Sequence, residues 1–483
     1  MNYFNGDKQY VCFRCKQVSD TNSKYCEACI SKNWKEKYGK CMECQQIITA
    51  KEWCQTCNSK RFQRNFDNWT SGNDEVDKFI QDTQLSAKNC FQVLEWIPYD
   101  RFNKPKLIGE GGFGKVYRAS WKDGYITHWD TSCNQWKRCK EKYNFVALKT
   151  HLKVHRVKAP LQVIKCHGIS QDPITKEYIM VMNYAKNGNL QTFLKEKRKD
   201  LCKTNKWPLK ELDFNLRLWK YKLGILYNIS SELYKIHGKG LIHRDLHIGN
   251  IVCNSLPCIT DMGLCKPANY HELNNKEKKG PYGVESYLAP EILRGENYTQ
   301  ASDIYSLGII IYEVISELPP YYNISTRDRI LAVEICEGLR PEFNIKVPQL
   351  ILHLIKRCLD ADPLNRPSTS EISRTFHEWL TEFNKYCENR LENEEAPRTE
   401  LIKQIEETEK INNENTKKIN NSSSNNSSLT NETIYKSRLL NFKNLPEPKN
   451  SNDYYENYEN ILSKIYSGTF LKSESNDLDS LKI

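Results

Sequence analysis

Two short stretches near the middle of the chain constrain its fold most, because their polar side chains have to converge. Residues 243–250 read H-R-D-L-H-I-G-N, and residues 261–263 read D-M-G. Asp245 is placed to accept a proton from a hydroxyl, and Asn250 and Asp261 carry oxygen atoms that can hold a metal ion. Transfer of a phosphoryl group requires a positioned base and bridging Mg²⁺ ions, so the pattern predicts two loops that share one site.

A glycine-rich stretch and a lysine precede these loops. Residues 107–116 read L-I-G-E-G-G-F-G-K-V, in which Gly109, Gly111 and Gly114 let the backbone turn and bring N–H groups to a phosphate. That spacing alone is a weak signal, but the strand-like run V-A-L-K at 146–149 follows it. With the later motifs, the order resembles that of the eukaryotic protein kinases over about residues 99–381.

The resemblance implies a role for each matching residue. Lys149 would hold the α and β phosphates of ATP, Asp245 would be the general base, and Asn250 and Asp261 would bind Mg²⁺. The implied nucleotide-binding set, beyond the glycines and Lys149, is Ile108, Val116, Ala147, Met182, Asn183, Ala185 and Val252. The implied fold class is α+β, with a β-rich small lobe and a helical large lobe.

The helix that follows the lysine in this family normally supplies a glutamate that pairs with it. Residues 150–160 contain no acidic residue, and the next acid is Asp172. The pattern therefore predicts a shortened helix region in the small lobe. Three interpretations stay open: a weakly active or inactive kinase that acts as a nucleotide-binding scaffold, an active kinase with a substitute acid, and a transcript variant.

The loops also bear on which hydroxyl is phosphorylated. His247 stands where many serine/threonine kinases have lysine, and Val284 stands where they have a threonine that bonds the catalytic aspartate. This mixture resembles the tyrosine-kinase-like group, which implies transfer to protein Ser or Thr, with Tyr as the alternative. The candidate phosphosites of the activation loop are Tyr270, Tyr282, Ser286 and Tyr287.

Other family positions imply structural roles. Glu291 is expected to pair with Arg366, and Asp303 is expected to brace the backbone of the catalytic loop. We interpret His243 as a packed imidazole that supports the same loop. Arg244, next to the base, suggests a clamp for a phosphate on the activation loop.

The N-terminal region, residues 10–60, is a cysteine-rich head. Two sulfurs in C-x-x-C spacing can reach one tetrahedral ion, and two such pairs complete a Cys₄ shell. We predict two sequential structural Zn²⁺ sites, because each half of the head is too short to bury a useful core. The head is expected to contact a protein partner, with a nucleic-acid partner as the weaker alternative. The predicted ligands are Cys12, Cys15, Cys26 and Cys29 in the first site, and Cys41, Cys44, Cys54 and Cys57 in the second.

The remaining segments complete the predicted organisation. Residues 61–98 form a linker with a short helix, residues 122–143 an inserted hairpin, and residues 382–483 a mostly disordered tail. The formal net charge of +11 is spread along the 483 residues, which favours solvated loops over a nucleic-acid surface. No apolar run is long enough to cross a membrane, and no signal peptide is evident. The 19 cysteines are then expected to be thiols or metal ligands in the cytoplasm.

Overall fold

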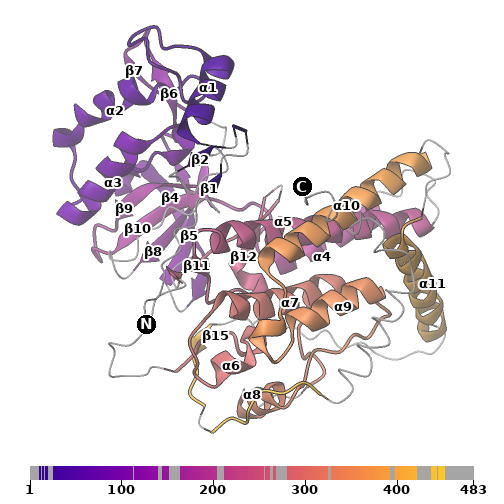
Figure 1. The fold of residues 1–483 in the computed structure, drawn as a ribbon. Helices are drawn as coiled ribbons and strands as arrows, with labels where there is room; N and C mark the ends of the chain where they lie inside the picture. The colour runs from indigo at the N-terminus through magenta and orange to yellow at the C-terminus, as the bar shows by residue number, and fades with distance from the viewer. Residues whose placement is uncertain are drawn as a thin grey trace, which may run out of the picture. The chain divides into compact units, whose positions relative to one another are not determined.

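The protein divides into two compact units, Met1–Tyr184 and Ala185–Ile483. The computed structural model, drawn in Figure 1, describes residues 10–11, 14–15, 17–19, 26–111, 114–139, 144–151, 164–203, 211–254, 256–261, 265–267, 280–324, 328–391, 398–420, 437–442 and 444–451.

A six-stranded sheet forms the centre of the first unit. Its strand order is β3-β9-β10-β8-β5-β4, antiparallel except for the β3–β9 pair. The strands are β3 (Glu95–Trp96), β4 (Phe102–Gly111), β5 (Gly114–Trp121), β8 (Phe145–His151), β9 (Cys166–Gln171) and β10 (Tyr178–Asn183).

The sheet buries one apolar face. Val146 and Leu148 on β8, like Ile179 and Val181 on β10, are two residues apart, so their side chains point to the same side of the pleat. They pack with Trp121 at the end of β5 in one cluster. This face fixes the register of the strands that carry the glycine-rich motif and Lys149.

The head and the linker supply the remaining elements of the first unit. They are β1 (Tyr10–Val11), β2 (Val18–Ser19), α1 (Glu27–Tyr38), α2 (Gln55–Gln63) and the linker helix α3 (Asp74–Ser86). The predicted insertion is confirmed as a hairpin of β6 (Ile126–Asp130) and β7 (Gln135–Arg138).

Aromatic side chains join the head to this hairpin. The Phe62 ring stacks on the Trp136 ring with centroids 4.5 Å apart, and the Trp53 and Trp136 rings are 5.9 Å apart. Trp53 and Phe62 are buried in one cluster with Ile126 of β6. The predicted linker helix is also confirmed, since α3 buries Val76 and Ile80 against the sheet.

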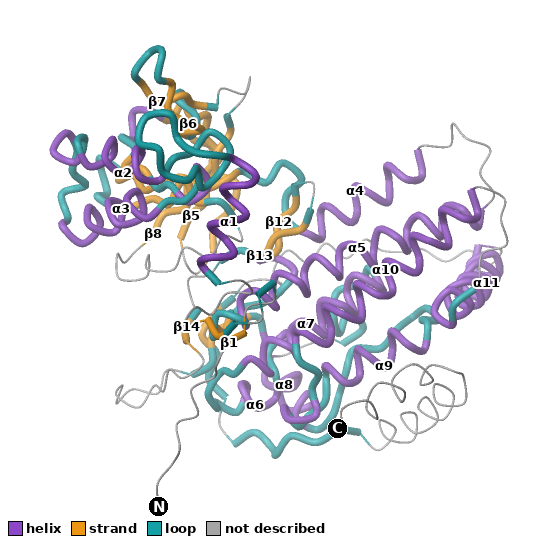
Figure 2. Tube along the Cα trace, turned by 45° about the horizontal axis from the view of Figure 1, so that its top comes forward, coloured by secondary structure: helices purple, strands orange, loops and turns teal. Residues whose placement is uncertain are grey.

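Helices dominate the second unit. Figure 2 shows α5, α7 and α10 side by side. In α7 every residue from 302 to 316 is buried, which makes it the central helix. The helices are α4 (Leu190–Lys203), α5 (Glu211–His237), α6 (Pro290–Leu293), α7 (Gln300–Ser316), α8 (Asp328–Cys336), α9 (Gln349–Cys358), α10 (Thr369–Leu391) and α11 (Glu400–Asn420).

Short strand pairs hold the loops of the second unit. They are β11 (Leu241–Ile242) with β14 (Lys266–Pro267), β12 (Ile251–Cys253) with β13 (Pro257–Ile259), and β15 (Tyr282–Gly283) with β16 (Arg438–Leu439). The last pair joins segments that are far apart in the sequence.

Parts of the tail that was predicted to be mostly disordered are ordered and packed, beginning with the end of α10, where Phe383 and Tyr386 are buried. Helix α11 buries Leu401, Ile402 and Ile405, and the Trp219 indole N–H donates to the Glu409 carboxylate at 2.8 Å. Residues 437–442 and 444–451 contact β15, the end of α6 and the end of α8 and are drawn in yellow in Figure 1. The rest of the tail lies outside the described residues.

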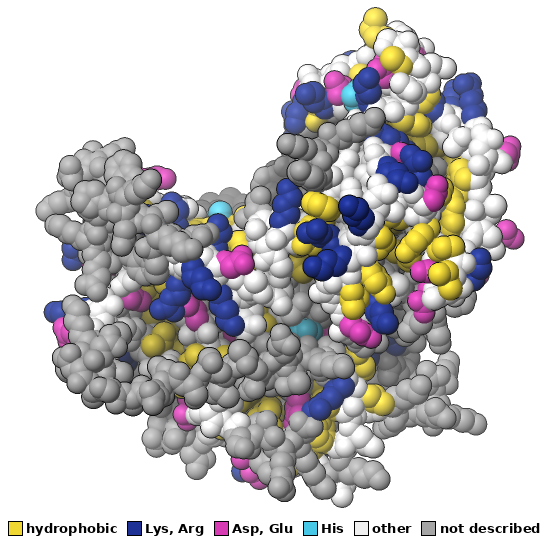
Figure 3. All heavy atoms as spheres, turned by 180° about the vertical axis from the view of Figure 1, so that it is seen from behind, with side chains coloured by type: hydrophobic (Ala, Val, Ile, Leu, Met, Phe, Trp, Pro, Cys, Tyr) yellow, Lys and Arg dark blue, Asp and Glu magenta, His cyan; other side chains and the backbone are white. Residues whose placement is uncertain are grey.

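The surface charge is dispersed where it can be seen. On the face drawn in Figure 3, the Lys and Arg side chains of described residues form separate groups, with Asp and Glu among them. None of the helices in the described part of the chain is long and apolar enough to span a membrane.

Candidate functional site

The loop that carries Asp245 is held by a buried carboxylate. Asp303, on α7, accepts hydrogen bonds from the backbone N–H of His243 at 2.7 Å and of Arg244 at 3.0 Å. Arg244 has a φ of 73°, a left-handed conformation that a non-glycine residue adopts only when its surroundings hold it there. The predicted bracing role of Asp303 is confirmed.

His243 is fully buried under this loop. Its Nε2 lies 2.9 Å from the backbone oxygen of Thr260, and its Nδ1 lies 3.3 Å from the backbone nitrogen of Asp245. Burial lowers the pKa of His243, so the ring is neutral near pH 7. These contacts agree with the interpretation of His243 as a packed support for the loop.

The Asp245 carboxylate is held in a fixed orientation. The Asn250 side-chain N–H₂ donates to the backbone oxygen of Asp245 at 2.8 Å and to its Oδ2 at 3.2 Å. His247 Nε2 lies 3.9 Å from Oδ2, and burial lowers the pKa of His247 to about 3. Asp245 therefore faces an uncharged imidazole and an amide.

A serine hydroxyl from the C-terminal region donates a hydrogen bond to this carboxylate. Ser437 Oγ is 2.9 Å from both Oδ1 and Oδ2 of Asp245, and 3.3 Å from His247 Nε2. Sequence reasoning did not single out Ser437. Its only signal was a serine between Lys436 and Arg438 in a polar segment.

Asn250 and Asp261 are joined through the residue between their loops. Both the backbone N–H and the hydroxyl of Thr260 donate to the Asn250 backbone oxygen, at 2.7 and 2.9 Å. The side-chain nitrogen of Asn250 donates to Asp245, so the side-chain oxygen of Asn250 is the atom that could bind a metal ion. An amide oxygen and a carboxylate suit Mg²⁺, so the residues present fit that ion.

The loop around β15 packs close to Asp245. A Cβ on Gly283 would lie 3.4 Å from Asp245 Oδ1, which shows how near the backbone approaches. Val284, Ser286 and Tyr287 are buried, and the Tyr287 hydroxyl donates to Glu313. Packing is therefore the structural role of Ser286 and Tyr287, whereas Tyr270 lies outside the described residues.

In the first unit, the described residues of the glycine-rich motif lie at the end of β4 and the start of β5, where Gly111 pairs with Gly114. Gly114 has a φ of 122°, and a Cβ there would lie 2.4 Å from the backbone oxygen of Thr150, so only glycine fits. Gly109, on β4, pairs with Val116 of β5, while Ile108 is 46% exposed.

Strand register brings the other predicted residues of this unit together. Lys149 on β8 lies opposite Val116 on β5, and Ala147 lies opposite Met182 on β10. Asn183 ends β10, and its Oδ1 lies 2.6 Å from His167 Nε2. The region predicted to hold a shortened helix, residues 152–163, lies outside the described residues.

Two predicted nucleotide-binding residues belong to the second unit. Ala185 is its first residue, and its backbone oxygen accepts from Gly188 N–H at 3.3 Å. Val252 is the middle residue of β12 and forms an isolated bridge with Asn189.

Cysteine sulfurs form two clusters in the head. Those of Cys41, Cys44, Cys54 and Cys57 all lie within 4.8 Å of one another, with Cys44 and Cys54 3.5 Å apart. Sulfurs around a tetrahedral Zn²⁺ at 2.3 Å would be about 3.8 Å apart, so this set fits the ion. In the other half, the sulfurs of Cys15, Cys26 and Cys29 cluster, and Cys12 lies outside the described residues.

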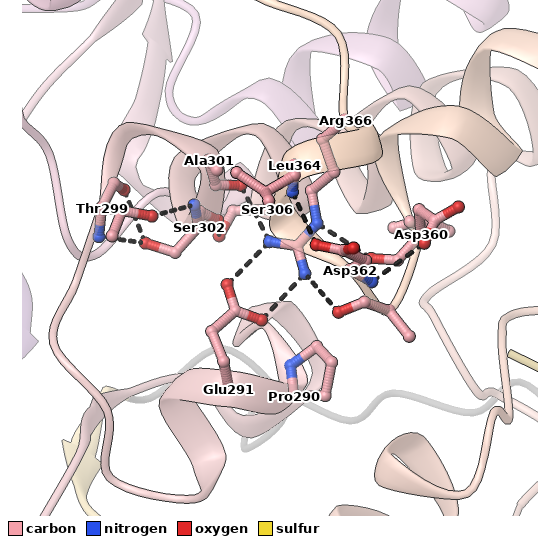
Figure 4. A network of polar contacts seen from close by, with 12 residues as sticks. Pro290, Glu291, Thr299, Ala301, Ser302, Ser306, Asp360, Asp362, Leu364 and Arg366 are labelled. Atoms are coloured by element: carbon pink, nitrogen blue, oxygen red, sulfur yellow. Dashed lines mark hydrogen bonds and ion pairs between the residues drawn. The ribbon is translucent and has the colours of Figure 1, made fainter. Parts of the chain in front are cut away.

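Figure 4 shows a buried ion pair between Glu291 on α6 and Arg366 in the loop that precedes α10. The Arg366 guanidinium donates to the two Glu291 oxygens at 2.7 and 2.8 Å and to the backbone oxygens of Ala301 and Asp360. The predicted pair is confirmed.

Comparison with known proteins agrees with this architecture. A family model described as protein tyrosine and serine/threonine kinase matches residues 102–376, more than half of the chain. The chain belongs to this family. The matched range covers the sheet except β3, both loops and α7.

The kinase is similar to several curated proteins. It is 27% identical, over 58% of its length, to a "probable serine/threonine-protein kinase" of Dictyostelium discoideum, and covers 15% of that protein. It is 29% identical, over 58% of its length, to human "mitogen-activated protein kinase kinase kinase 7", and covers 42% of it. The chain thus spans less than half the length of these relatives.

Proposed function

We propose that this kinase transfers the γ-phosphoryl group of ATP to serine or threonine hydroxyls of proteins. The observation that carries the proposal is the serine hydroxyl held 2.9 Å from both oxygens of the Asp245 carboxylate. A general base has to lie within about 2.6–3.2 Å of the group whose proton it removes. The name of the Dictyostelium relative, a probable serine/threonine-protein kinase, supports the same acceptors, and the name of the human relative supports protein kinase chemistry.

The proposed roles follow the family motifs. Asp245 takes the proton of the acceptor hydroxyl, and Lys149 together with the N–H groups of the glycine-rich turn binds the phosphates. Asn250 and Asp261 would hold Mg²⁺, which neutralises charge that develops on the phosphates. The proposed adenine contacts are Ile108, Val116, Ala147, Met182, Asn183, Ala185 and Val252.

Asp245→Asn tests this function directly. An amide cannot take the proton, so incorporation of labelled phosphate into a generic protein substrate should fall by about 10²–10⁴-fold. Asp362→Asn is the matched control, because it makes the same change in an exposed turn where an amide oxygen still accepts from Leu364 N–H. Equal incorporation by wild type and Asp245→Asn would leave the nucleotide-binding scaffold as the function.

We also assign the kinase to the tyrosine-kinase-like group, on the basis of His247 and Val284 in its loops. The assignment predicts that phosphoamino-acid analysis of a mixed protein substrate yields phosphoserine and phosphothreonine. Phosphotyrosine as the main product would contradict it.

For the head, we propose two structural Zn²⁺ sites built from the eight cysteines predicted above. Support comes from the close approach of the sulfurs of Cys41, Cys44, Cys54 and Cys57. Elemental analysis of the purified chain should then find two zinc ions per molecule, and none would contradict the proposal. We further propose that the exposed side chain of Met42 marks a contact with a protein partner.

We propose a cytoplasmic location as well. Its support is that the cysteines of the described residues form no disulfide, as expected in a reducing compartment.

A further inference from the structure

Residues 437–442 and 444–451 lie along the second unit, and we define them as the docked segment. Near its start, β16 pairs antiparallel with β15, with Arg438 opposite Gly283 and Leu439 opposite Tyr282. The Tyr282 hydroxyl donates to the Ser437 backbone oxygen at 3.1 Å, and Leu440 N–H donates to Pro281 at 2.8 Å.

The path continues to the opposite end of the segment. Arg294, just after α6, forms a bidentate ion pair with Glu447. Lys449 N–H donates to the Cys336 backbone oxygen at 3.0 Å, at the end of α8. Asn450 accepts from Ala361 N–H at 2.9 Å and donates to Asp360 at 3.1 Å.

Two glycines make room for this path. A Cβ on Gly280 would lie 2.0 Å from the Leu440 backbone oxygen, and a Cβ on Gly338 would lie 2.6 Å from the Ser451 backbone nitrogen. Real Cβ atoms are not found at such distances, so the backbone of the docked segment occupies the space that side chains would fill. The close fit is therefore seen near both ends of the segment, at Leu440 and at Ser451.

The segment presents its serine to the site as an acceptor would be presented. Ser437 Oγ lies 2.9 Å from both carboxylate oxygens of Asp245 and 3.3 Å from His247 Nε2. Val284 has no hydroxyl to offer this carboxylate. The next residue, Arg438, lies 3.6 Å from the carboxylate of the buried Glu285, and Leu440 is 5% exposed.

We propose that the docked segment is a substrate of its own kinase domain and that Ser437 is phosphorylated within the same molecule. The proposal rests on the function proposed above and names its first acceptor. It also defines an acceptor class: a serine followed directly by a basic residue that meets Glu285, with an apolar residue three positions after the serine.

The reaction balances with ATP as the second substrate. Ser437 Oγ forms a bond to the γ-phosphorus while the bond from that phosphorus to the β–γ bridging oxygen breaks, and ADP leaves. The hydroxyl proton passes to the Asp245 carboxylate and then to water. The new phosphoserine carries about −1.5 to −2 charges next to Asp245, so repulsion expels the segment and opens the β15 edge to other proteins.

The first measurement uses the full-length chain, dephosphorylated and then incubated with Mg²⁺ and ATP. Mass spectrometry of the glutamyl-endopeptidase fragment that begins at Thr433 should place the phosphate on Ser437, and Asp245→Asn should abolish it. The rate should not change over a hundredfold range of protein concentration. Phosphate on Thr433 or Tyr435 instead, or a rate proportional to concentration, would overturn the proposal.

The second measurement compares Ser437 with an added protein substrate. Gly280→Ala places a methyl group against Leu440, so the ratio of Ser437 phosphorylation to substrate phosphorylation should fall at least tenfold. Gly224→Ala is the matched control, because a Cβ there meets nothing within 4 Å, and it should leave the ratio unchanged. An unchanged ratio in Gly280→Ala would overturn the docking path.

Hydrogen exchange separates the two proposals. The amides of residues 438–441 should exchange more slowly in wild type than in Gly280→Ala, and ATP should remove that protection. Phosphorylation of the added substrate with no phosphate on Ser437 would overturn this inference and leave the proposed function. Protected amides with no phosphate on any protein would overturn both the proposed function and the phosphorylation of Ser437. The segment would then be an inhibitor that occupies the site.

Discussion

Asp303 offers the sharpest test of how the fold supports the site. Asp303→Asn keeps the shape of the side chain but replaces one carboxylate oxygen with an N–H₂ group. The native carboxylate accepts from His243 N–H, from Arg244 N–H and from the His237 ring at 2.7, 3.0 and 2.9 Å. In the variant, one of these N–H donors would face the N–H₂ group of asparagine and would lose its acceptor.

The magnitude follows from burial. Asp303 is 2% exposed, so water cannot replace the lost acceptor. A hydrogen bond to a charged group contributes about 1.5–3 kcal/mol, and an unsatisfied buried N–H costs about 1–3 kcal/mol. We expect the free energy of unfolding to fall by about 3 kcal/mol, and the melting temperature of the second unit to fall by roughly 6–12 °C.

Asp303→Asn should also lower the rate of phosphoryl transfer. Arg244 is held at a φ of 73° between these bonds and Asp245, so relaxation of the loop moves the carboxylate that faces the acceptor. Misplacement of a catalytic group by about 1 Å costs roughly a hundredfold in rate. Asp303 touches neither nucleotide nor acceptor, and its effect should therefore appear in kcat more than in the KM for ATP.

Denaturant unfolding and initial-rate kinetics are the assays. Asp362→Asn is the control, and its free energy of unfolding should change by only about a few tenths of a kcal/mol, because asparagine and aspartate cap equally well. An Asp303→Asn protein with wild-type stability and wild-type kcat would refute the reasoning. A change in stability alone would show that Asp303 supports α7 and not the loop.

Three further expectations concern the rest of the molecule. Glu291→Gln leaves the buried Arg366 without its counter-charge and should cost about 3–5 kcal/mol in a denaturant melt, whereas Glu371→Gln, in a half-exposed pair with Arg357, should cost less than about 1 kcal/mol. Cys54→Ser should release one zinc ion per chain by elemental analysis, while Cys133→Ser, at an exposed thiol outside both sulfur clusters, should release none. Burial lowers the pKa of His167 from 6.5 to about 4, so the unfolded chain binds a proton first as the pH falls; the first unit should lose about 3 kcal/mol between pH 7 and pH 4, and His167→Gln should remove much of that loss.

The sequence predicted those parts of the fold that are encoded by short-range spacing. The strands that carry Gly114 and Lys149 and the loop that carries Asp245 follow from motifs of four to ten residues. Glu291 and Arg366 could be paired because the family places them at recognisable positions. In each case local residue types fix the backbone, and the apolar faces fix the register.

The docked segment could not be predicted in this way. Its contacts join residues such as Ser437 and Asp245, which are 192 positions apart, and many use backbone groups that every residue possesses. A polar composition predicts disorder only when nothing compensates the ordering entropy. For residues 437–451, strand pairing, an ion pair and the space beside Gly280 provide that compensation.

The packing of the head gives the proposed metal sites a second structural role. Cys54 directly precedes α2, and Phe62 near the end of that helix stacks on Trp136 of the inserted hairpin. The hairpin is tied in turn to the central sheet, since Arg138 of β7 pairs with Glu95 of β3. A metal that holds the start of α2 therefore also holds Phe62 against the hairpin, so chelation should lower the melting temperature of the sheet as well as unfold the head. The cysteine-rich region therefore packs as part of the first unit, and the proposed metal sites would stabilise the same body that carries the glycine-rich motif.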